Sequence, residues 1–383
     1  MGGGAGGTRR GIARAATLGL LAGLGLSNHH TIVLLAPIGL YGVWLAYRES
    51  ESLLATLATA AATGLVGLLP YVYLAATARP CDDCLQWGRP DDLASVWHVF
   101  IRADYGTTSL GVGGERLPLE NLAAFGAHLV AGTLGVVVLL SLVGVVRWRR
   151  LHLDRAAGVV LGLSFLLAGP LFAALFNIAP EGIGAEIVAR FYALPLILLT
   201  PFVGAGASVG TRTATLAGAL AAVVGLTSAP RVVGSHTDAI ESYAHDLLAP
   251  LPPDAILIGT GDHRMFGVLY QQHAYDFRTD VTYIDAELLA HGWYEERVER
   301  RLGVELPSST ATSIPINRAI AVLLRSGRPV FATHVFFEEL RQFPTYPFGV
   351  TLRLVGVGAV GDRRAGFRRE DRRDHLVRRA VAQ

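Results

Sequence analysis

Long apolar runs constrain this chain more than any other feature. A helix that crosses a bilayer needs about 20 mostly apolar residues. Charged residues make up only 17% of the 383 residues, whereas ordinary soluble domains carry about 25%. Seven runs qualify as candidate spans: 11–27, 31–47, 52–74, 121–146, 156–178, 188–207 and 212–230. The sequence therefore predicts a mainly α-helical, polytopic transmembrane bundle that occupies residues 1–230.

The arginines near the ends of these runs predict an orientation. Loops on the cytoplasmic side of a membrane carry an excess of basic residues. If all seven runs cross the membrane, the arginines near their ends all lie on the same side; these are Arg9, Arg10, Arg14, Arg48, Arg147, Arg149, Arg150, Arg155 and Arg212. We therefore expect a cytoplasmic N-terminus in a bacterial inner or plasma membrane. The corner at 28–30, the loop 75–120 and the region after 231 are then extracytoplasmic.

A polar corner, Gly25–Thr31, interrupts the first two apolar runs. It places Asn28, His29 and His30 where one helix would leave the lipid and the next would enter. Polar side chains at that depth are costly and often mark a functional site that faces a water-filled cavity. A structural interpretation is a simple turn, with Asn28 as a helix cap and the histidines in contact with headgroups.

The loop 75–120 is too long for a plain connector. Within it, 91–102 has helical spacing, with Asp91 or Asp92 as the cap and an apolar face that includes Trp97 and Phe100. We expect a helix that lies on the membrane surface, with Trp87 and Trp97 at headgroup level. Outside the cell, Cys81 and Cys84 would form a disulfide or stay idle, since two cysteines alone do not build a structural zinc site.

Residues 231–360 change character and predict a small extracytoplasmic α/β domain, because helix-like and strand-like segments alternate there. Strands are expected at 255–260, 281–285, 328–334 and near 350–357, and helices at 236–248, 263–274, 286–302 and 315–326. The tail 361–383 is rich in arginine pairs broken by acidic residues, which predicts a frayed, solvated segment and not a nucleic-acid site.

A glycine pair in this domain imitates a dinucleotide-binding turn. Gly259 and Gly261 follow a predicted strand, and Asp285 lies about twenty residues further on. Arg264 holds the place of the third glycine, however, and the domain is expected outside the cell. We therefore interpret the segment as a tight turn and predict no cofactor.

Several motifs together resemble one family of membrane enzymes. In chain order they are Gly25-Leu-Ser-Asn-His-His-Thr31, Trp87-Gly-Arg-Pro90, Arg102-Ala-Asp-Tyr-Gly106, Arg190-Phe-Tyr-Ala-Leu-Pro195, Ile258-Gly-Thr-Gly-Asp262, Asp280-Val-Thr-Tyr-Ile-Asp285 and Trp293-Tyr294. Their order and spacing over most of 15–300 resemble the polytopic glycosyltransferases related to the eukaryotic endoplasmic-reticulum protein O-mannosyltransferase of plexin-type receptors.

This resemblance implies a GT-C-type fold and transfer of a sugar from a polyprenyl-phosphate donor to a protein or other extracytoplasmic acceptor. In the family, an Asp-Ser-Gly-Glu-like stretch in the first external loop would carry the catalytic carboxylate. This chain has no such stretch. We expect an N-terminally truncated fragment; a misassigned start or a loss of catalysis are the alternatives.

The chemistry of such a transfer selects candidate site residues. A departing phosphate needs cations or hydrogen-bond donors, and the arginine fork binds phosphate oxygens in pairs. The candidates for substrate binding are Asn28, His29, His30, Arg102, Tyr105 and Arg190. Arg190 could instead snorkel to the interface, and Arg102 could form a surface salt bridge. The catalytic base is not identified; the weak candidates are Asp104, Glu181 and Glu186. No metal site is predicted.

A second interpretation belongs to a different class. The missing carboxylate stretch favours a non-catalytic membrane scaffold or a transporter-like bundle that presents an external α/β domain. A transporter would more typically show internal repeats or paired broken helices, which the sequence does not show.

Overall fold

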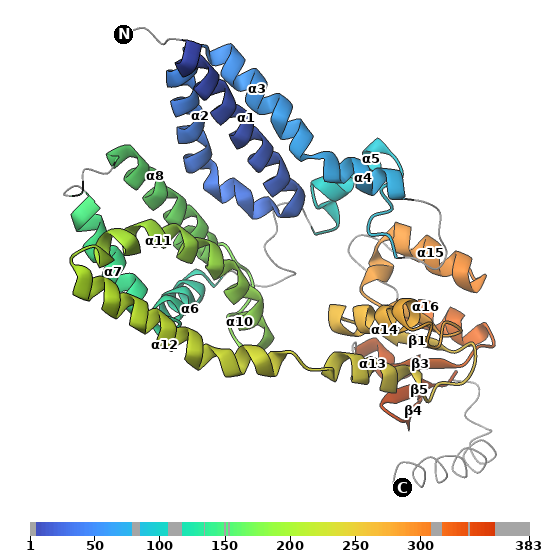
Figure 1. The fold of residues 1–383 in the computed structure, drawn as a ribbon. Helices are drawn as coiled ribbons and strands as arrows, with labels where there is room; N and C mark the ends of the chain where they lie inside the picture. The colour runs from blue at the N-terminus through green and yellow to red at the C-terminus, as the bar shows by residue number, and fades with distance from the viewer. Residues whose placement is uncertain are drawn as a thin grey trace. The chain divides into compact units, whose positions relative to one another are not determined.

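The computed structural model describes residues 5–78, 85–105, 117–133, 135–148, 151, 154–307, 316–335 and 338–356 (Figure 1). The chain forms two compact units. Unit 1 consists of Met1–Arg79 and Arg89–Val233, and unit 2 of Pro80–Gly88 and Gly234–Gln383. The two cysteines of the loop and the basic tail from 361 lie outside the described residues.

Unit 1 is built from helices. They are α1 Ala5–Asn28, α2 Ala36–Ser50, α3 Leu53–Gly67, α4 Leu69–Thr77, α5 Leu93–Phe100, α6 Pro118–Ala131, α7 Val136–Trp148, α8 Arg155–Leu166, α9 Phe172–Ala174, α10 Gly182–Ala189, α11 Ala193–Ala207 and α12 Thr211–Ser235. Three short 3-10 turns, η1 His30–Leu35, η2 Ala103–Tyr105 and η4 Arg190–Tyr192, begin or follow these helices. A π-helical turn, η3 Leu167–Leu171, joins α8 to α9.

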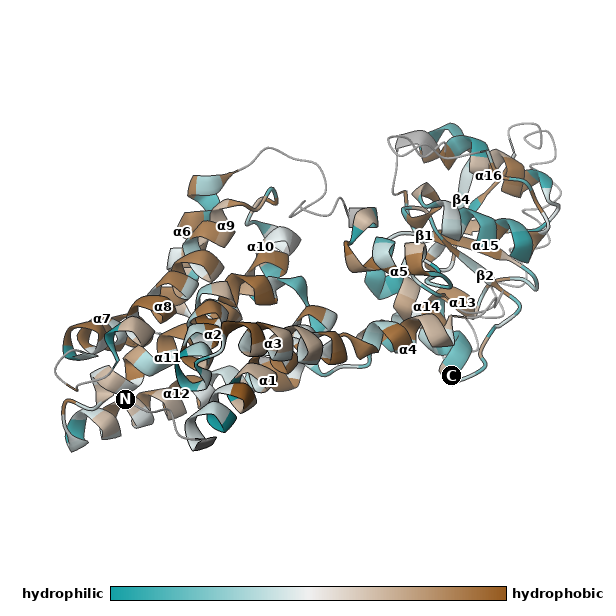
Figure 2. Cartoon of the chain, turned by 90° about the horizontal axis from the view of Figure 1, so that it is seen from above, coloured by the Kyte–Doolittle hydropathy of each residue, from teal (hydrophilic) through white to brown (hydrophobic). Residues whose placement is uncertain are grey.

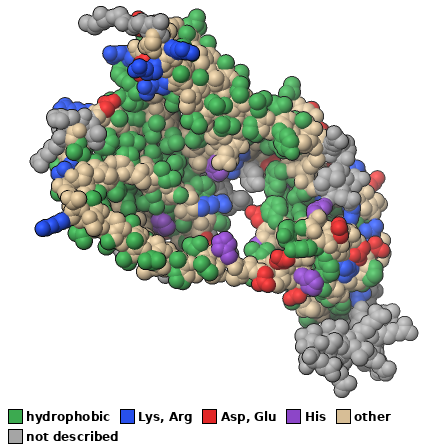
Figure 3. Space-filling model, in the orientation of Figure 1, with side chains coloured by type: hydrophobic (Ala, Val, Ile, Leu, Met, Phe, Trp, Pro, Cys, Tyr) green, Lys and Arg blue, Asp and Glu red, His purple; other side chains and the backbone are tan. Residues whose placement is uncertain are grey.

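Five helical stretches are long and apolar enough to cross a membrane, and a sixth is added if α6 and α7, bent by 91°, count as one span. The five are His30–Ser50, Leu53–Thr77, Arg155–Ala174, Gly184–Ala207 and Thr211–Leu248. At most 28% of the apolar window of any of them is buried in the protein. Figures 2 and 3 show the resulting apolar surface of the helices. Such a surface suits lipid contact.

The prediction of seven spans exceeds this number at the N-terminal end. Six of the predicted ranges overlap the five stretches and the bent pair, whereas 11–27 lies in α1, which is not among them. The helix forms as expected, but its glycines, Arg14 and its polar end at Ser27 and Asn28 lower its hydropathy.

Glycines allow the helices of unit 1 to approach closely. A Cβ on Gly23 of α1 would collide with the backbone of Gly64 in α3, and a Cβ on Gly206 of α11 would collide with the backbone of Leu140 in α7. Between helices in lipid, where hydrophobic attraction is weak, small residues gain dispersion contacts by letting backbones meet. Helix packing here therefore depends on the absence of side chains at specific positions.

Unit 2 is the predicted small α/β domain. Its strands are β1 Ile256–Gly259, β2 Thr282–Asp285, β3 Val330–Ala332, β4 Thr345–Phe348 and β5 Thr351–Leu354, and its helices are α13 Ala239–Leu248, α14 Asp262–Ala274, α15 Gly292–Leu302 and α16 Ile316–Arg325. The sheet order is β2-β1-β3-β5-β4. Strand β1 is parallel to β2 and β3, and β5 is antiparallel to β3 and β4. The three parallel strands are buried, as their apolar runs predict.

The sequence did not predict strand β4. It contains Pro347 and has only partly buried side chains. Proline removes a ladder hydrogen bond and is tolerated chiefly in edge strands, and β4 is one of the two edge strands of the described sheet. Its weak local signal follows from that position.

The loop region differs from its predicted placement in one respect. Helix α5 forms with Asp92 as its cap, in a capping box with Ser95, and Trp97 is 59% exposed, which agrees with a surface helix. Trp87, expected at headgroup level, packs instead against the core of unit 2, with its ring 5.7 Å from that of Trp293. Local sequence could not show this partner, which lies 206 residues further along the chain.

Candidate substrate-binding site at one end of the helical unit

The polar corner between α1 and η1 is organised by His29. Asn28 ends α1 with an exposed side chain, and His29, in an extended conformation, caps η1. Its Nδ1 accepts from the backbone N–H of Thr31 at 3.3 Å and lies 2.9 Å from the Thr31 hydroxyl. The turn interpretation proposed Asn28 as the helix cap, but the capping residue is His29. With Nδ1 used as an acceptor, a neutral His29 carries its proton on Nε2 and can donate from there.

Aromatic rings bring four separate segments to this corner. His29 lies 5.9 Å from the ring of Phe191 in η4, and His30 lies 5.6 Å from the ring of Phe100 in α5. Phe100 also contacts Tyr71 of α4, at 5.3 Å. His30 Nε2 is buried and has no hydrogen-bond partner in the described part of the chain. Such unsatisfied buried groups are rare and need an explanation.

Two arginines lie beside the histidines. The Arg190 guanidinium stacks on Phe191, with Cζ 5.1 Å from the ring centre. Arg102 follows α5 in a left-handed conformation with φ +55°. Burial, Arg102, His30 and Arg190 together hold the pKa of His29 below its ordinary value. Its imidazole is therefore neutral near pH 7, and the corner is a cationic site with a neutral N–H donor.

The positive charge of Arg190 is not paired with a carboxylate in the described residues. It is exposed, and no described carboxylate forms an ion pair with it. Behind it, the side chain of Phe191 packs against Phe172 and Phe176. Asn121 of α6, which is fully buried, donates from Nδ2 to the carbonyl of Phe176 at 3.3 Å. A packed floor therefore holds the segment that presents this guanidinium.

The candidate carboxylates are less well placed. Asp104 Oδ1 lies 2.7 Å from His98 Nε2, and its side chain is only 10% exposed. Glu181 directly precedes α10, and Glu186 lies within it; both are exposed. Tyr105 ends η2, but its side chain lies outside what the structure describes. In the part of the chain that is described, no three His, Cys, Asp or Glu side chains are grouped to hold a metal ion.

The structure thus brings together His29, His30, Arg102 and Arg190 from three distant parts of the sequence. Sequence reasoning missed His98 and Phe100 as members of this environment. His98 lies in the last turn of α5, six residues before Asp104. A histidine at the end of a predicted helix, followed by an aspartate, is the signal that could have identified the pair.

The helices define an integral membrane protein in which the cationic corner is a candidate binding site of the helical unit and the α/β domain forms a second unit. Comparison with known proteins gives its relatives. Residues 240–317 match the family model described as TMEM260-associated domain 2. The chain is similar to the protein O-mannosyl-transferase TMEM260 of Mus musculus, with 25% identity over 355 residues, 85% of this chain and 48% of the relative.

A second relative is the protein O-mannosyl-transferase tmem260 of Dictyostelium discoideum, 22% identical over 307 residues, which cover 71% of this chain and 38% of that protein. The chain therefore spans less than half the length of these curated relatives. No solved structure matches it. These findings confirm the resemblance to membrane protein O-mannosyl-transferases that the motifs indicated.

Proposed function

We propose that this chain is part of a membrane glycosyltransferase that transfers a mannosyl-type sugar from a polyprenyl-phosphate donor to an extracytoplasmic acceptor, with a protein hydroxyl as the expected acceptor. The observation that carries the proposal is the convergence of Arg190, Arg102 and His29 at one end of the helical unit. The names of the relatives support the reaction class.

The orientation belongs to the same proposal. Arg14 pairs with Glu49 at 2.7 Å, which joins the N-terminal half of α1 to the end of α2, and Arg147 donates to the carbonyl of Ser208 where α7 and α11 end. These basic ends are the ones that sequence places on the cytoplasmic side. The corner at His29 lies at the opposite end of α1 and would face outward.

The residues divide the work of the transfer. In the reaction, the acceptor oxygen forms a bond to the anomeric carbon, the bond to the phosphate oxygen breaks, and the acceptor proton passes to a carboxylate. Arg190 and Arg102 would hold the departing phosphate by charge-assisted hydrogen bonds. His29 would donate from Nε2, and His30 would supply a further imidazole. Asp104, Glu181 and Glu186 are the carboxylates proposed as bases, and Asp104 already has His98 as a partner.

The test separates donor binding from transfer. Donor binding is measured by labelling this chain in detergent with a photoreactive polyprenyl phosphate. Mannosyl transfer is measured with the whole enzyme of which this chain is proposed to be part. A charge-assisted phosphate contact contributes about 1.5–3 kcal/mol, or about 10- to 100-fold in affinity. Arg190→Ala and His30→Ala should reduce labelling and transfer by at least that lower factor. Arg190→Lys should restore part of the loss.

Arg212→Ala is the matched control, because Arg212 is exposed in the first turn of α12, at an end that the sequence predicts to be cytoplasmic. It should leave labelling unchanged. Labelling and transfer that stay intact in both site variants would exclude these residues from the site. A protein that binds no polyprenyl phosphate at all would favour the non-catalytic scaffold.

A further inference from the structure

The carboxyl edge of the parallel strands in unit 2 is a second place where polar side chains converge. The chain passes from β1 through α14 to β2 on one side of β1, and then through α15 and α16 to β3 on the other side. A change of direction of this kind opens a crevice at the carboxyl ends of the strands, where ligands of α/β sheets bind. Here the crevice lies between the ends of β1 and β3.

Two glycines allow neighbouring side chains to approach the backbone closely at this edge. A Cβ on Gly259, the last residue of β1, would lie 2.5 Å from the Tyr283 hydroxyl and 3.0 Å from Thr333 Cγ2. Gly261, with φ +90°, precedes α14, and a Cβ on it would lie 3.3 Å from the His263 ring and 3.7 Å from Arg264 Nη1. Side chains from the ends of β2 and β3 and from the first turn of α14 therefore surround positions that carry no side chain.

Arg264 brings a positive charge that no described carboxylate matches with an ion pair. Its Nη1 donates to the carbonyl of Thr260 at 3.0 Å, and its Nε donates to the Tyr243 hydroxyl at 3.4 Å. Both acceptors are neutral. A half-buried guanidinium with only neutral partners is a site at which an anion would gain charge-assisted hydrogen bonds.

The hydroxyl of Tyr283 is a second, independent sign of a missing partner. The residue is 6% exposed, and its hydroxyl is buried with no hydrogen-bond partner in the described residues. Burial and the neighbouring Asp285 raise the pKa of Tyr283 far above its usual range, so the group keeps its proton and can only donate or accept as a hydroxyl. It lies against Gly259, beside the turn that leads into α14.

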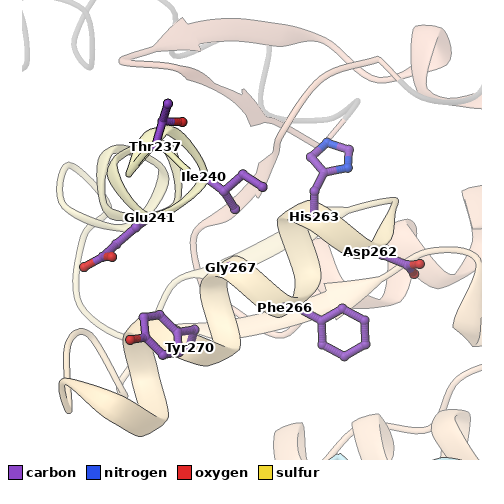
Figure 4. A pocket seen from close by; sticks show the side chains of 8 residues that line it. All are labelled: Thr237, Ile240, Glu241, Asp262, His263, Phe266, Gly267 and Tyr270. Carbon is purple, nitrogen blue, oxygen red and sulfur yellow. The ribbon is translucent and has the colours of Figure 1, made fainter. Parts of the chain in front are cut away.

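The start of α14 and the end of β3 complete the surroundings. Gly261 caps α14 with no side chain, so the first backbone N–H groups of this 13-residue helix have no side-chain cap. His334, whose Nδ1 is 2.8 Å from the Thr333 hydroxyl, has its pKa lowered by burial, Arg264 and His263. His263 also lines an open groove of ≈ 630 Å³ between α13 and α14, together with Asp262 and Glu241 (Figure 4).

We propose that this edge, formed by Gly259–Arg264, Tyr283 and Thr333–His334, binds a phosphate group. The phosphate oxygens would accept from the N–H groups at the start of α14, from the Arg264 guanidinium and from the Tyr283 hydroxyl, and His263 and His334 would flank them. The sequence alone favoured a plain tight turn here, since the third glycine is absent. The inference concerns binding in unit 2 and does not depend on the proposed transfer reaction.

The test is a calorimetric titration of the full chain in a zwitterionic detergent. Two probes distinguish the source of the phosphate: inorganic phosphate in solution, and a short prenyl phosphate carried in the micelle, each against chloride at equal ionic strength. We expect saturable binding of at least one probe with one site per chain. Arg264→Gln should weaken it at least 10-fold, and Tyr283→Phe should weaken it several-fold.

Tyr283→Phe keeps the ring and removes only an unsatisfied hydroxyl, so it tests the site even if Arg264→Gln fails to fold. Arg325→Gln is the matched control, because Arg325 is an exposed arginine at the end of α16 in the same unit. It should bind as the unmodified chain does. The inference is wrong if neither phosphate probe binds, or if binding is equal in the Arg264, Tyr283 and Arg325 variants.

Discussion

Asp285 should make the stability of unit 2 fall as the pH rises, which is the reverse of the usual behaviour of a carboxylate. The residue ends β2, is 2% exposed, and accepts from the backbone N–H groups of Glu287 and Leu288 at 3.0 and 3.2 Å. Burial outweighs these hydrogen bonds and raises its pKa from 3.8 to about 6. The folded state therefore binds the proton more tightly than the unfolded chain does.

The magnitude follows from linkage. The stabilisation of the folded state by protonated Asp285 is complete below about pH 4, is lost as the pH rises through the folded-state pKa of about 6, and is absent at higher pH. A shift of this size corresponds to about 3 kcal/mol at neutral pH. The change Asp285→Asn removes the charge and keeps an oxygen for both backbone donors. We expect the variant to match the unmodified chain at pH 4 and to exceed its stability by up to about 3 kcal/mol at pH 8.

Hydrogen exchange of the β1 and β2 amides, followed by mass spectrometry from pH 4 to pH 8, measures this difference in the full chain. Each variant is compared with the unmodified chain at the same pH, so that the intrinsic exchange rate cancels. Asp280→Asn is the control of opposite sign, because Arg278 holds the pKa of Asp280 below its ordinary value. A difference for Asp285→Asn that is constant with pH would refute the assigned burial of an ionisable carboxyl group.

Two further predictions concern packing. Gly206→Leu should push α11 away from α7 and lower the stability of the protein in detergent by about 1–3 kcal/mol or more. Gly204→Leu should be tolerated, because no atom outside its own helix turn lies within 4 Å of a Cβ at that position. Equal melting temperatures for the two variants would contradict this packing. Arg278 donates to the carbonyls of Leu248, Leu251 and Pro252 and pairs with Asp280. Arg278→Lys, which lacks the fork, should cost about 2–4 kcal/mol in chemical denaturation followed by circular dichroism.

Much of the fold could be predicted from local sequence. Spans such as 52–74 and 188–207 are recognised by hydropathy alone, because insertion into lipid depends on the summed transfer free energy of a continuous segment. Strands β1 and β2 are recognised as apolar runs, and Asp92 is recognised as a helix cap. The edge strand β4 was missed because its proline and its partial burial leave little local signal.

The candidate site was predictable only as separate residues. His29 and Arg190 were each selected because polar side chains among apolar ones are costly. Their proximity depends on the packing of both side chains against Phe191 of η4, and no periodicity in the sequence indicates this contact. His98, which pairs with Asp104 six residues further on, was missed although a histidine at the end of a predicted helix, followed by an aspartate, is a local signal.

By itself, the sequence determined that this chain is a membrane bundle with an α/β region and that its motifs resemble the O-mannosyl-transferases. Hydropathy, helix caps and strand patterns are properties of neighbouring residues, so they can be recognised without any knowledge of tertiary packing. Only the tertiary structure decided that Trp87 packs in unit 2, that His29 lies within the electrostatic influence of two arginines distant in sequence, and that Tyr283 lies against Gly259. These contacts join residues far apart in the chain. They form because the close packing of whole helices and strands fixes the positions of these side chains.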